Sequence, residues 1–227
     1  RVDGVPRRAI DAVGQLNVSL FLPEDINLVA GSPSARRRYL DITLCQVDPV
    51  YCRTLSRYNR VVSQRNALLK QLREGHPSRG ERNAWDEQLV RLGTYILDSR
   101  RQAVDHLGAR VAHVHPALTG GREHLALQYQ STVAEESGTQ ARTVEAEGIE
   151  EQFVCALHNV RRQEIARGVT VVGPHRDDLR FLINGRDATT YGSRGQQRTV
   201  ALALKLAEVG FMQHATGEAP VLLLDDV

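Results

Sequence analysis

The apolar segment near the end of this chain constrains its fold more than any other short stretch. Val221–Leu224 is a run of four apolar residues, and Asp225 and Asp226 follow it directly. The run comes after Gly217 and Pro220, which break the preceding helical pattern. Such a run is typical of a buried central strand in an α/β sheet, with its carboxyl end at the edge where ligands bind.

The two acids at this strand end are the candidate catalytic and metal-binding residues. Asp225 suits a magnesium ion held through water, because Mg²⁺ prefers oxygen ligands and keeps much of its hydration. Asp226 is placed to orient or deprotonate an attacking water. Taken alone, the same two acids also fit an ordinary solvated strand end.

A second candidate site lies about thirty residues earlier. Ser193, Arg194, Gly195 and Gln196 form a turn that opens an apolar helix reaching to about Gln213. Gly195 lets a phosphate approach the backbone, and the free N–H groups and dipole of the helix favour an anion there. A simple capped helix explains the turn equally well in isolation. The spacing between this turn and the strand-end acids is more specific than either part.

Size and composition place the chain among ordinary globular proteins. Its 227 residues allow one large domain or two small ones, and its net charge of +2 leaves nucleic-acid binding to local patches. The three cysteines show no CxxC spacing, which favours reduced thiols in a cytosol. The scattered histidines do not suggest a metal site, and neither a membrane span nor a signal peptide is visible. Both ends resemble cuts in a longer protein.

Residues 1–47 are expected to mix strand and helix. The residues at 1–5 suggest a hairpin, a short helix follows from Pro6 to about Val13, and a strand spans Asn17 to Phe21. Ser32 or Ser34 then caps a helix that contains Arg36, Arg37 and Arg38.

Residues 50–115 show the most regular pattern. Apolar residues recur at steps of three and four on either side of a turn at 75–80, with Arg65 as a polar break, and Pro116 closes the segment. The pattern predicts two long amphipathic helices, either as an antiparallel hairpin or as two ordinary helices on a domain core.

The remaining segments alternate between strand and helix signals. The sequence predicts a strand around Leu125–Tyr129, an exposed loop over 134–147 and a helix over 149–164. It then predicts strands at 169–172 and 179–183, and Asn184-Gly185 predicts a hairpin turn. We expect an α/β fold in which residues 1–45 and 168–227 form one lobe and residues 46–167 form an inserted helical lobe.

Several motifs together resemble one family. The Ser193–Gln196 turn followed by the Asp225-Asp226 strand resembles the signature motif and Walker B strand of ABC-type ATPase heads. Further stretches are similar to the RecF family of recombination mediators. These stretches are Phe21-Leu22-Pro23-Glu24-Asp25, Gly31-Ser32-Pro33-Ser34 with Ala35 to Asp41, Tyr58-Asn59-Arg60, Gln64-Arg65-Asn66 with Ala67 to Lys70, and Gly173-Pro174-His175-Arg176-Asp177-Asp178-Leu179. The resemblance covers nearly the whole chain outside residues 117–150.

This resemblance implies an ABC-ATPase-like head that uses ATP and Mg²⁺. Two such heads sandwich two ATP molecules, and the homodimer binds DNA, including gapped and single-stranded DNA. Ser193, Gly195 and Gln196 then match the turn that caps the γ-phosphate held by the other copy, with Arg194 at a variable position. Asp225 matches the magnesium-associated acid, and Asp226 matches the catalytic acid.

The resemblance also implies partners and a cellular setting. We expect a bacterial cytoplasmic, nucleoid-associated protein that works with recombination mediator proteins and a recombinase in DNA repair, replication and the SOS response. Arg36, Arg37, Arg38, Arg65 and Lys70 are the candidate DNA-binding residues, although a solvated or ion-paired surface is an equally open interpretation.

Two features depart from the family pattern. No Gly-x-x-x-x-Gly-Lys-Ser/Thr loop occurs in the chain, so we expect this chain alone neither to hydrolyse ATP nor to bind it tightly. The acidic loop and switch histidine expected after Asp226 are also missing. The alternatives are a Rad50- or SMC-like head, for which the helical span is too short, and a non-catalytic DNA-binding or scaffolding protein.

Overall fold

The computed structural model describes residues 13–76, 81–133 and 146–225. The chain forms two compact units. The first comprises the described residues up to Cys52, Arg100–Gln130 and those from Asp178 on, and the second comprises those in Arg53–Ser99 and Ser131–Asp177. The division falls within helices α4 (Pro49–Arg73) and α5 (Glu81–Thr119).

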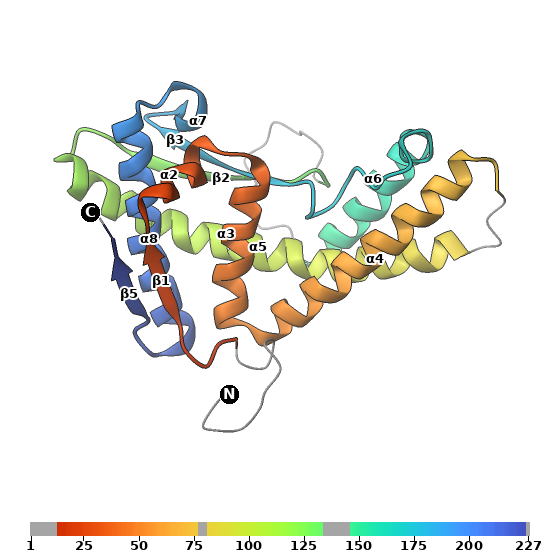
Figure 1. Cartoon of the computed structure of the whole chain (residues 1–227), viewed down its shortest axis with the longest axis horizontal. Coiled ribbons are helices and arrows are strands. Elements are labelled where there is room, and N and C mark those ends of the chain that lie inside the picture. The colour runs from red at the N-terminus through yellow and green to blue at the C-terminus, as the bar shows by residue number, and fades with distance from the viewer. Residues whose placement is uncertain (1–12, 77–80, 134–145, 226–227) are drawn as a thin grey trace. The chain divides into compact units, whose positions relative to one another are not determined.

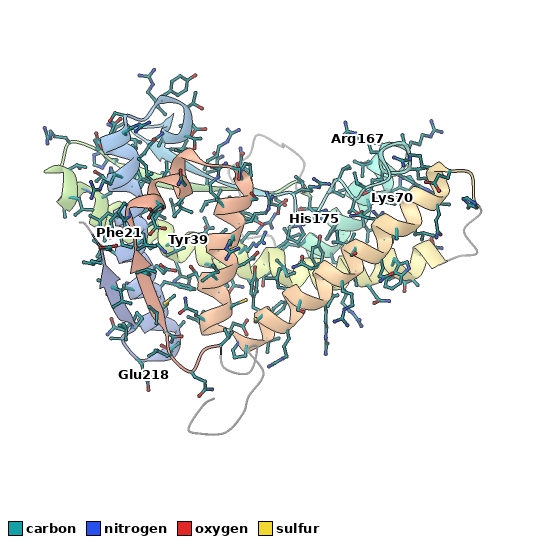
Figure 2. The ribbon with its side chains drawn as sticks, viewed as in Figure 1. Phe21, Tyr39, Lys70, Arg167, His175 and Glu218 are labelled. Atoms are coloured by element: carbon teal, nitrogen blue, oxygen red, sulfur yellow. The ribbon has the colours of Figure 1, made fainter. Side chains whose placement is uncertain are left out.

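Helix α8 (Arg194–Thr216) is the core element of the first unit. It packs against strand β1 (Val18–Phe21) and against helices α2 (Ile26–Ala30) and α3 (Pro33–Val47) (Figure 1). Its buried face is rich in alanine, which allows neighbouring elements to approach closely. Phe21 of β1 and Tyr39 of α3 are both buried, and the Tyr39 hydroxyl donates to the Leu204 carbonyl of α8 at 3.4 Å (Figure 2).

The first unit contains two small sheets. Strand β5 (Val221–Leu224) pairs in parallel with β1, with Val18 opposite Val221. Strands β2 (Leu125–Gln130), β3 (Asp178–Ile183) and β4 (Arg186–Asp187) form an antiparallel sheet in that order. A 3₁₀ turn η1 (Pro23–Asp25) precedes α2, and a short helix α7 (Ala188–Tyr191) follows β4.

The turn between β3 and β4 confirms the predicted hairpin. Asn184 and Gly185 both have positive φ, at 50° and 79°. Two successive residues with positive φ match the right-handed twist of the flanking strands, and Asn-Gly is the pair that adopts this conformation most readily.

The second unit is built from parts of α4 and α5 and from α6 (Ala146–Arg167). Tyr58 of α4 lies beside Gly93 of α5, and Arg65 of α4 bonds Asp86 of α5, so the two helices run antiparallel. This confirms the predicted hairpin. A side chain at Gly93 would collide with the Phe153 ring of α6, so glycine allows the close approach of α5 and α6 there.

A buried polar network, here called the Arg65 cluster, ties this unit together. Arg65 donates to Glu164 at 2.6 Å, to Asp86 at 2.7 Å and to the Thr170 hydroxyl at 2.9 Å. The Asn66 side-chain oxygen accepts from the Thr170 N–H at 2.7 Å. Burial lowers the pKa of Arg65 and the Glu164 and Asp86 carboxylates raise it, with a net increase. The cluster fixes the segment after α6 onto α4.

The structure confirms the α/β class and most of the predicted elements, with three differences. Residues 169–172 form no strand, because hydrogen bonds from the Arg65 cluster hold this segment. Pro116 lies inside α5, which ends at Thr119. The compact units also differ from the predicted lobes of residues 1–45 with 168–227 and residues 46–167. The amphipathic pattern of α5 continues unbroken past residue 100, so the sequence carries no signal of the division there.

Some predictions lie outside the described residues. These are the hairpin at 1–5, the helix from Pro6 apart from its last residue, most of the loop at 134–147, and Asp226. Within the described part of the chain, no helix is long and apolar enough to span a membrane.

Candidate functional site

The residues Ser193–Gln196, here called the signature corner, form the N-terminal turn of α8. Ser193 is the N-cap, and its Oγ accepts from the Gln196 N–H at 3.2 Å. The Gln196 side-chain oxygen accepts in return from the Ser193 N–H at 2.8 Å. This reciprocal pair is a capping box, which satisfies two backbone donors at the start of the helix.

The capping box leaves a distinct set of donors for a ligand. Because Ser193 Oγ accepts a hydrogen bond, its own O–H proton remains able to donate. The N–H groups of Arg194 and Gly195 lie in the first turn, where an α-helix offers them no intrahelical acceptor. Ser193, Arg194 and Gly195 are all exposed to solvent. The corner therefore presents hydrogen-bond donors at the positive end of a 23-residue helix.

Packing within the described residues does not explain the absence of a side chain at Gly195. Among them, a Cβ atom built there would meet only Ser193 Oγ, at 4.0 Å. A helix with glycine near its start is less stable than the same helix with alanine there, by up to about 1 kcal/mol. The open space over Gly195 instead suits the close approach of a phosphate to the backbone.

Asp225 follows β5 and is exposed, and its N–H donates to the Phe21 carbonyl at 3.0 Å. In the described residues, Leu223 and Leu224 are 50% and 48% exposed, and β5 has β1 as its one strand neighbour. That Val221–Leu224 is a buried central strand of the whole protein stays a prediction. Asp226 lies outside the described residues.

The signature corner and Asp225 can be compared with the contacts that a phosphate group and a magnesium ion require. The open corner with its outward donors fits a phosphate group. The exposed Asp225 fits Mg²⁺, which proteins bind through one or two carboxylates together with substrate phosphates and water. The described residues hold no cluster of three or more His, Cys, Asp or Glu side chains suited to a metal. A magnesium ion held by Asp225 would take further ligands from nucleotide phosphates and water.

Two of the five predicted DNA-binding residues are buried in ion pairs. Arg36 makes a two-point contact with Asp178, at 2.7 and 2.9 Å, and donates to the Gly31 carbonyl at 2.8 Å. Arg65 is only 2% exposed within its cluster. Both guanidinium groups are used inside the fold, so neither is accessible to a DNA phosphate. Arg37 is half-buried and also has an intramolecular partner, whereas Arg38 and Lys70 are exposed.

A basic stripe on α4 joins Arg60, which the sequence offered as a candidate beside Arg65, Lys70 and Arg73, to Arg53 and Arg57, which were not predicted. Arg53, Arg57 and Arg60 are all exposed, and they span only about 60° of the helix circumference and about 10 Å of its length. The 25-residue helix contains no acidic residue. Among the described residues none of the three forms an ion pair. The i, i+4, i+7 spacing without acids was the signal that could have found them.

The Gly173–Asp178 motif has structural roles in the described residues. The Tyr58 hydroxyl lies 2.8 Å from His175 Nδ1, and His175 Nε2 lies 3.2 Å from the Thr170 carbonyl. Asp177 is fully buried and accepts from both the N–H and the hydroxyl of Thr132, each at 2.7 Å. Asp178 binds Arg36. These contacts explain why polar residues occur in this motif without any ligand.

The fold is that of an ABC-ATPase-like head, and comparisons with known proteins specify its family. No family model matches the chain. The DNA replication and repair protein RecF of Chloroflexus aurantiacus is 46% identical over the whole chain and over 58% of its own length. A solved structure of the recombination mediator protein RecF-ATPrS in the RecFOR pathway has a TM-score of 0.90 and 33% identity, and covers 98% of this chain and 58% of that one. A RecF-ATP structure from the same pathway has a TM-score of 0.87 and 34% identity, covering 95% and 56%.

By these matches the chain belongs to the RecF family. It spans a little more than half of the length of the relatives that it matches.

Proposed function

We propose that the protein containing this chain is an ATP-dependent recombination mediator in DNA repair and replication. ATP closes two copies into a dimer, and the signature corner of each copy contacts the terminal phosphate of the ATP held by the other. The single observation that carries this proposal is the solvent-exposed corner with donors that the fold leaves unused. A corner buried within its own chain could not reach a second copy.

The residues of the corner have separate roles in this proposal. The Ser193 hydroxyl and the N–H groups of Arg194 and Gly195 donate to phosphate oxygens. Gln196 holds the corner through its bond to the Ser193 N–H. Asp225 holds Mg²⁺ through water, and Asp226 orients the attacking water as the catalytic acid. Magnesium supplies charge neutralisation between the phosphates.

We assign DNA binding to the basic stripe of Arg53, Arg57 and Arg60. Three exposed guanidinium groups on one face, with no acid on the helix, favour a polyanion such as the DNA backbone. Arg38 and Lys70 remain further candidates because both are exposed. ATP-driven closure would raise DNA affinity at single-strand/duplex junctions in gapped DNA, and hydrolysis would release it. Mediator proteins and a recombinase would then be recruited there.

Substitution of Ser193 by arginine tests the proposal. Ser193→Arg removes the hydroxyl and fills the space over the corner, so the full-length protein should lose ATP-dependent dimerisation in sedimentation velocity. Unfolding stability should fall by only about 1 kcal/mol, the usual cost of losing an N-cap. Dimerisation equal to that of the wild type would remove the corner from the nucleotide site and favour a scaffolding role.

A further inference from the structure

Glu123 connects the signature corner to the end of helix α5. One carboxylate oxygen accepts from the Gln196 side-chain amide at 2.8 Å. The other lies 3.2 Å from His115 Nε2. The Glu123 side chain is 20% exposed, and the His115 side chain is fully buried. Glu123 therefore lies between a buried ring on α5 and the first turn of α8.

Two glycines bring Glu123 to this position. Helix α5 ends at Thr119, and Gly120 and Gly121 follow with φ of 63° and 76°. Positive φ at two successive positions strains any residue with a Cβ, and glycine avoids that strain. The turn folds the chain back, so that Glu123, which lies beyond the end of α5, reaches His115 eight residues earlier on that helix.

The hydrogen bond to Glu123 fixes the orientation of the Gln196 side-chain amide. An ionised carboxylate only accepts hydrogen bonds, so Gln196 must direct its NH₂ group toward Glu123. Its oxygen then faces the Ser193 N–H, as found at 2.8 Å. The opposite orientation would place an oxygen against the carboxylate and an NH₂ group against the Ser193 N–H. Glu123 thereby selects the orientation that completes the capping box.

His115 holds Glu123 from the other side. Nδ1 of His115 is buried and has no partner among the described residues. We assign the proton to Nε2, which then donates to Glu123, because an unpaired buried N–H at Nδ1 would cost more than an unpaired acceptor. Both Glu123 oxygens are thus occupied, one by each neighbour.

We propose that Glu123 is a positioning residue for the nucleotide contact made by the signature corner. It fixes the Gln196 amide, which fixes Ser193, so that the serine hydroxyl and the first helical N–H groups face a phosphate on the second copy. This inference rests on the proposed function of the corner. Glu123 itself contacts neither nucleotide nor magnesium in this arrangement.

The test uses the full-length protein and ATP, with dimerisation measured by sedimentation velocity. Glu123→Ala should weaken ATP-dependent dimerisation by roughly 10-fold or more, because the corner on each of the two copies loses the contact that fixes Gln196. Glu123→Gln carries an amide that can turn its NH₂ group toward either neighbour, so it no longer selects the Gln196 orientation and should recover only part of the affinity. Glu123→Ala leaves the buried His115 N–H unpaired, so its melting temperature should fall. The variant should still be folded at the assay temperature, and nucleotide binding by its dilute monomer should stay unchanged, which separates positioning from a loss of folding.

A double-substitution cycle shows whether Glu123 acts through Gln196. In a Gln196→Ala background, Glu123→Ala should cause no further loss of dimerisation. The inference is overturned if Glu123→Ala or Glu123→Gln dimerises like the wild type, or if the two losses simply add. Failure of the proposed function would look different, because the wild type would then show no ATP-dependent dimer, or Ser193→Arg would dimerise normally.

Discussion

The signature corner and the Arg65 cluster are both rich in polar groups and both belong to motifs that resemble the RecF family. They differ in how far the fold satisfies those groups. In the Arg65 cluster, Arg65 is 2% exposed and bonds two carboxylates and a hydroxyl within the chain. In the corner, Ser193, Arg194 and Gly195 are exposed, and donors remain for an external ligand. We therefore propose that polar groups bonded within the chain serve the fold, and that exposed polar groups with donors to spare are the candidates for ligand binding.

Arg65→Met should give the largest effect if the cluster is a scaffold. Removing Arg65 leaves Glu164 buried without its ionic partner, and unfolding stability should fall by about 3–5 kcal/mol. Urea unfolding monitored by circular dichroism measures this. Arg60→Met, on the exposed face of the same helix, is the matched control and should change stability by less than about 0.5 kcal/mol. Equal effects of the two substitutions would contradict the distinction.

The basic stripe tests the same distinction for DNA binding. Replacing Arg53, Arg57 and Arg60 together by glutamine should lower DNA affinity at about 0.1 M salt by roughly 10-fold or more. The slope of log affinity against log salt should also fall by about 2–3. Fluorescence anisotropy with labelled gapped DNA measures both quantities.

The matched control for the DNA-binding prediction replaces three exposed arginines that lie outside the basic stripe. Arg161, Arg162 and Arg167 are also exposed arginines, on α6. Their joint replacement by glutamine should leave DNA affinity within about 2-fold if the α4 stripe is the contact surface. An equal loss in both triple variants would indicate a general charge effect and exclude a specific stripe.

Gly195→Ala should separate stability from function at the corner. Alanine favours the helix and meets nothing closer than 4.0 Å, so stability should rise by up to about 1 kcal/mol. ATP-dependent dimerisation should weaken, because the methyl group occupies the approach of the phosphate. Gly108→Ala is the control, since Gly108 lies in α5 with nothing within 4 Å of an added Cβ. It should stabilise to a similar degree and leave dimerisation unchanged.

The smallest expected effect concerns the thiols. Burial, followed by a hydrogen bond to Cys52, raises the pKa of Cys45, whereas Cys155 is exposed. A thiol whose pKa is higher in the folded state stabilises the fold below its unfolded pKa, and that contribution is lost as the pH rises above about 9. At pH 8, Cys155 should react first with a thiol reagent and Cys45 last, as followed by mass spectrometry. Faster labelling of Cys45 would contradict its burial.

Much of the fold could be predicted because helix and strand periods are local signals. The long helices on either side of residue 75, the strand at Val18–Phe21 and the Asn184-Gly185 hairpin all follow from short-range patterns. The signature corner was predicted for the same reason, since a serine cap and a helix start are adjacent in the chain.

The features that could not be predicted depend on contacts between residues that lie far apart in the sequence. Arg36 pairs with Asp178 across 142 positions, and Arg65 pairs with Glu164 across 99. A single sequence shows the charge of each arginine but not its partner, so buried and exposed arginines look alike.

The central claim is that the corner acts on a nucleotide held by a second copy, and mixing two inactive variants tests it most directly. Full-length Ser193→Arg and Asp226→Asn should each hydrolyse ATP poorly. Their mixed dimer contains one site with an intact acid from one copy and an intact corner from the other. We predict that the 1:1 mixture recovers a substantial part of wild-type hydrolysis at one site. A mixture no more active than either variant alone would contradict the account.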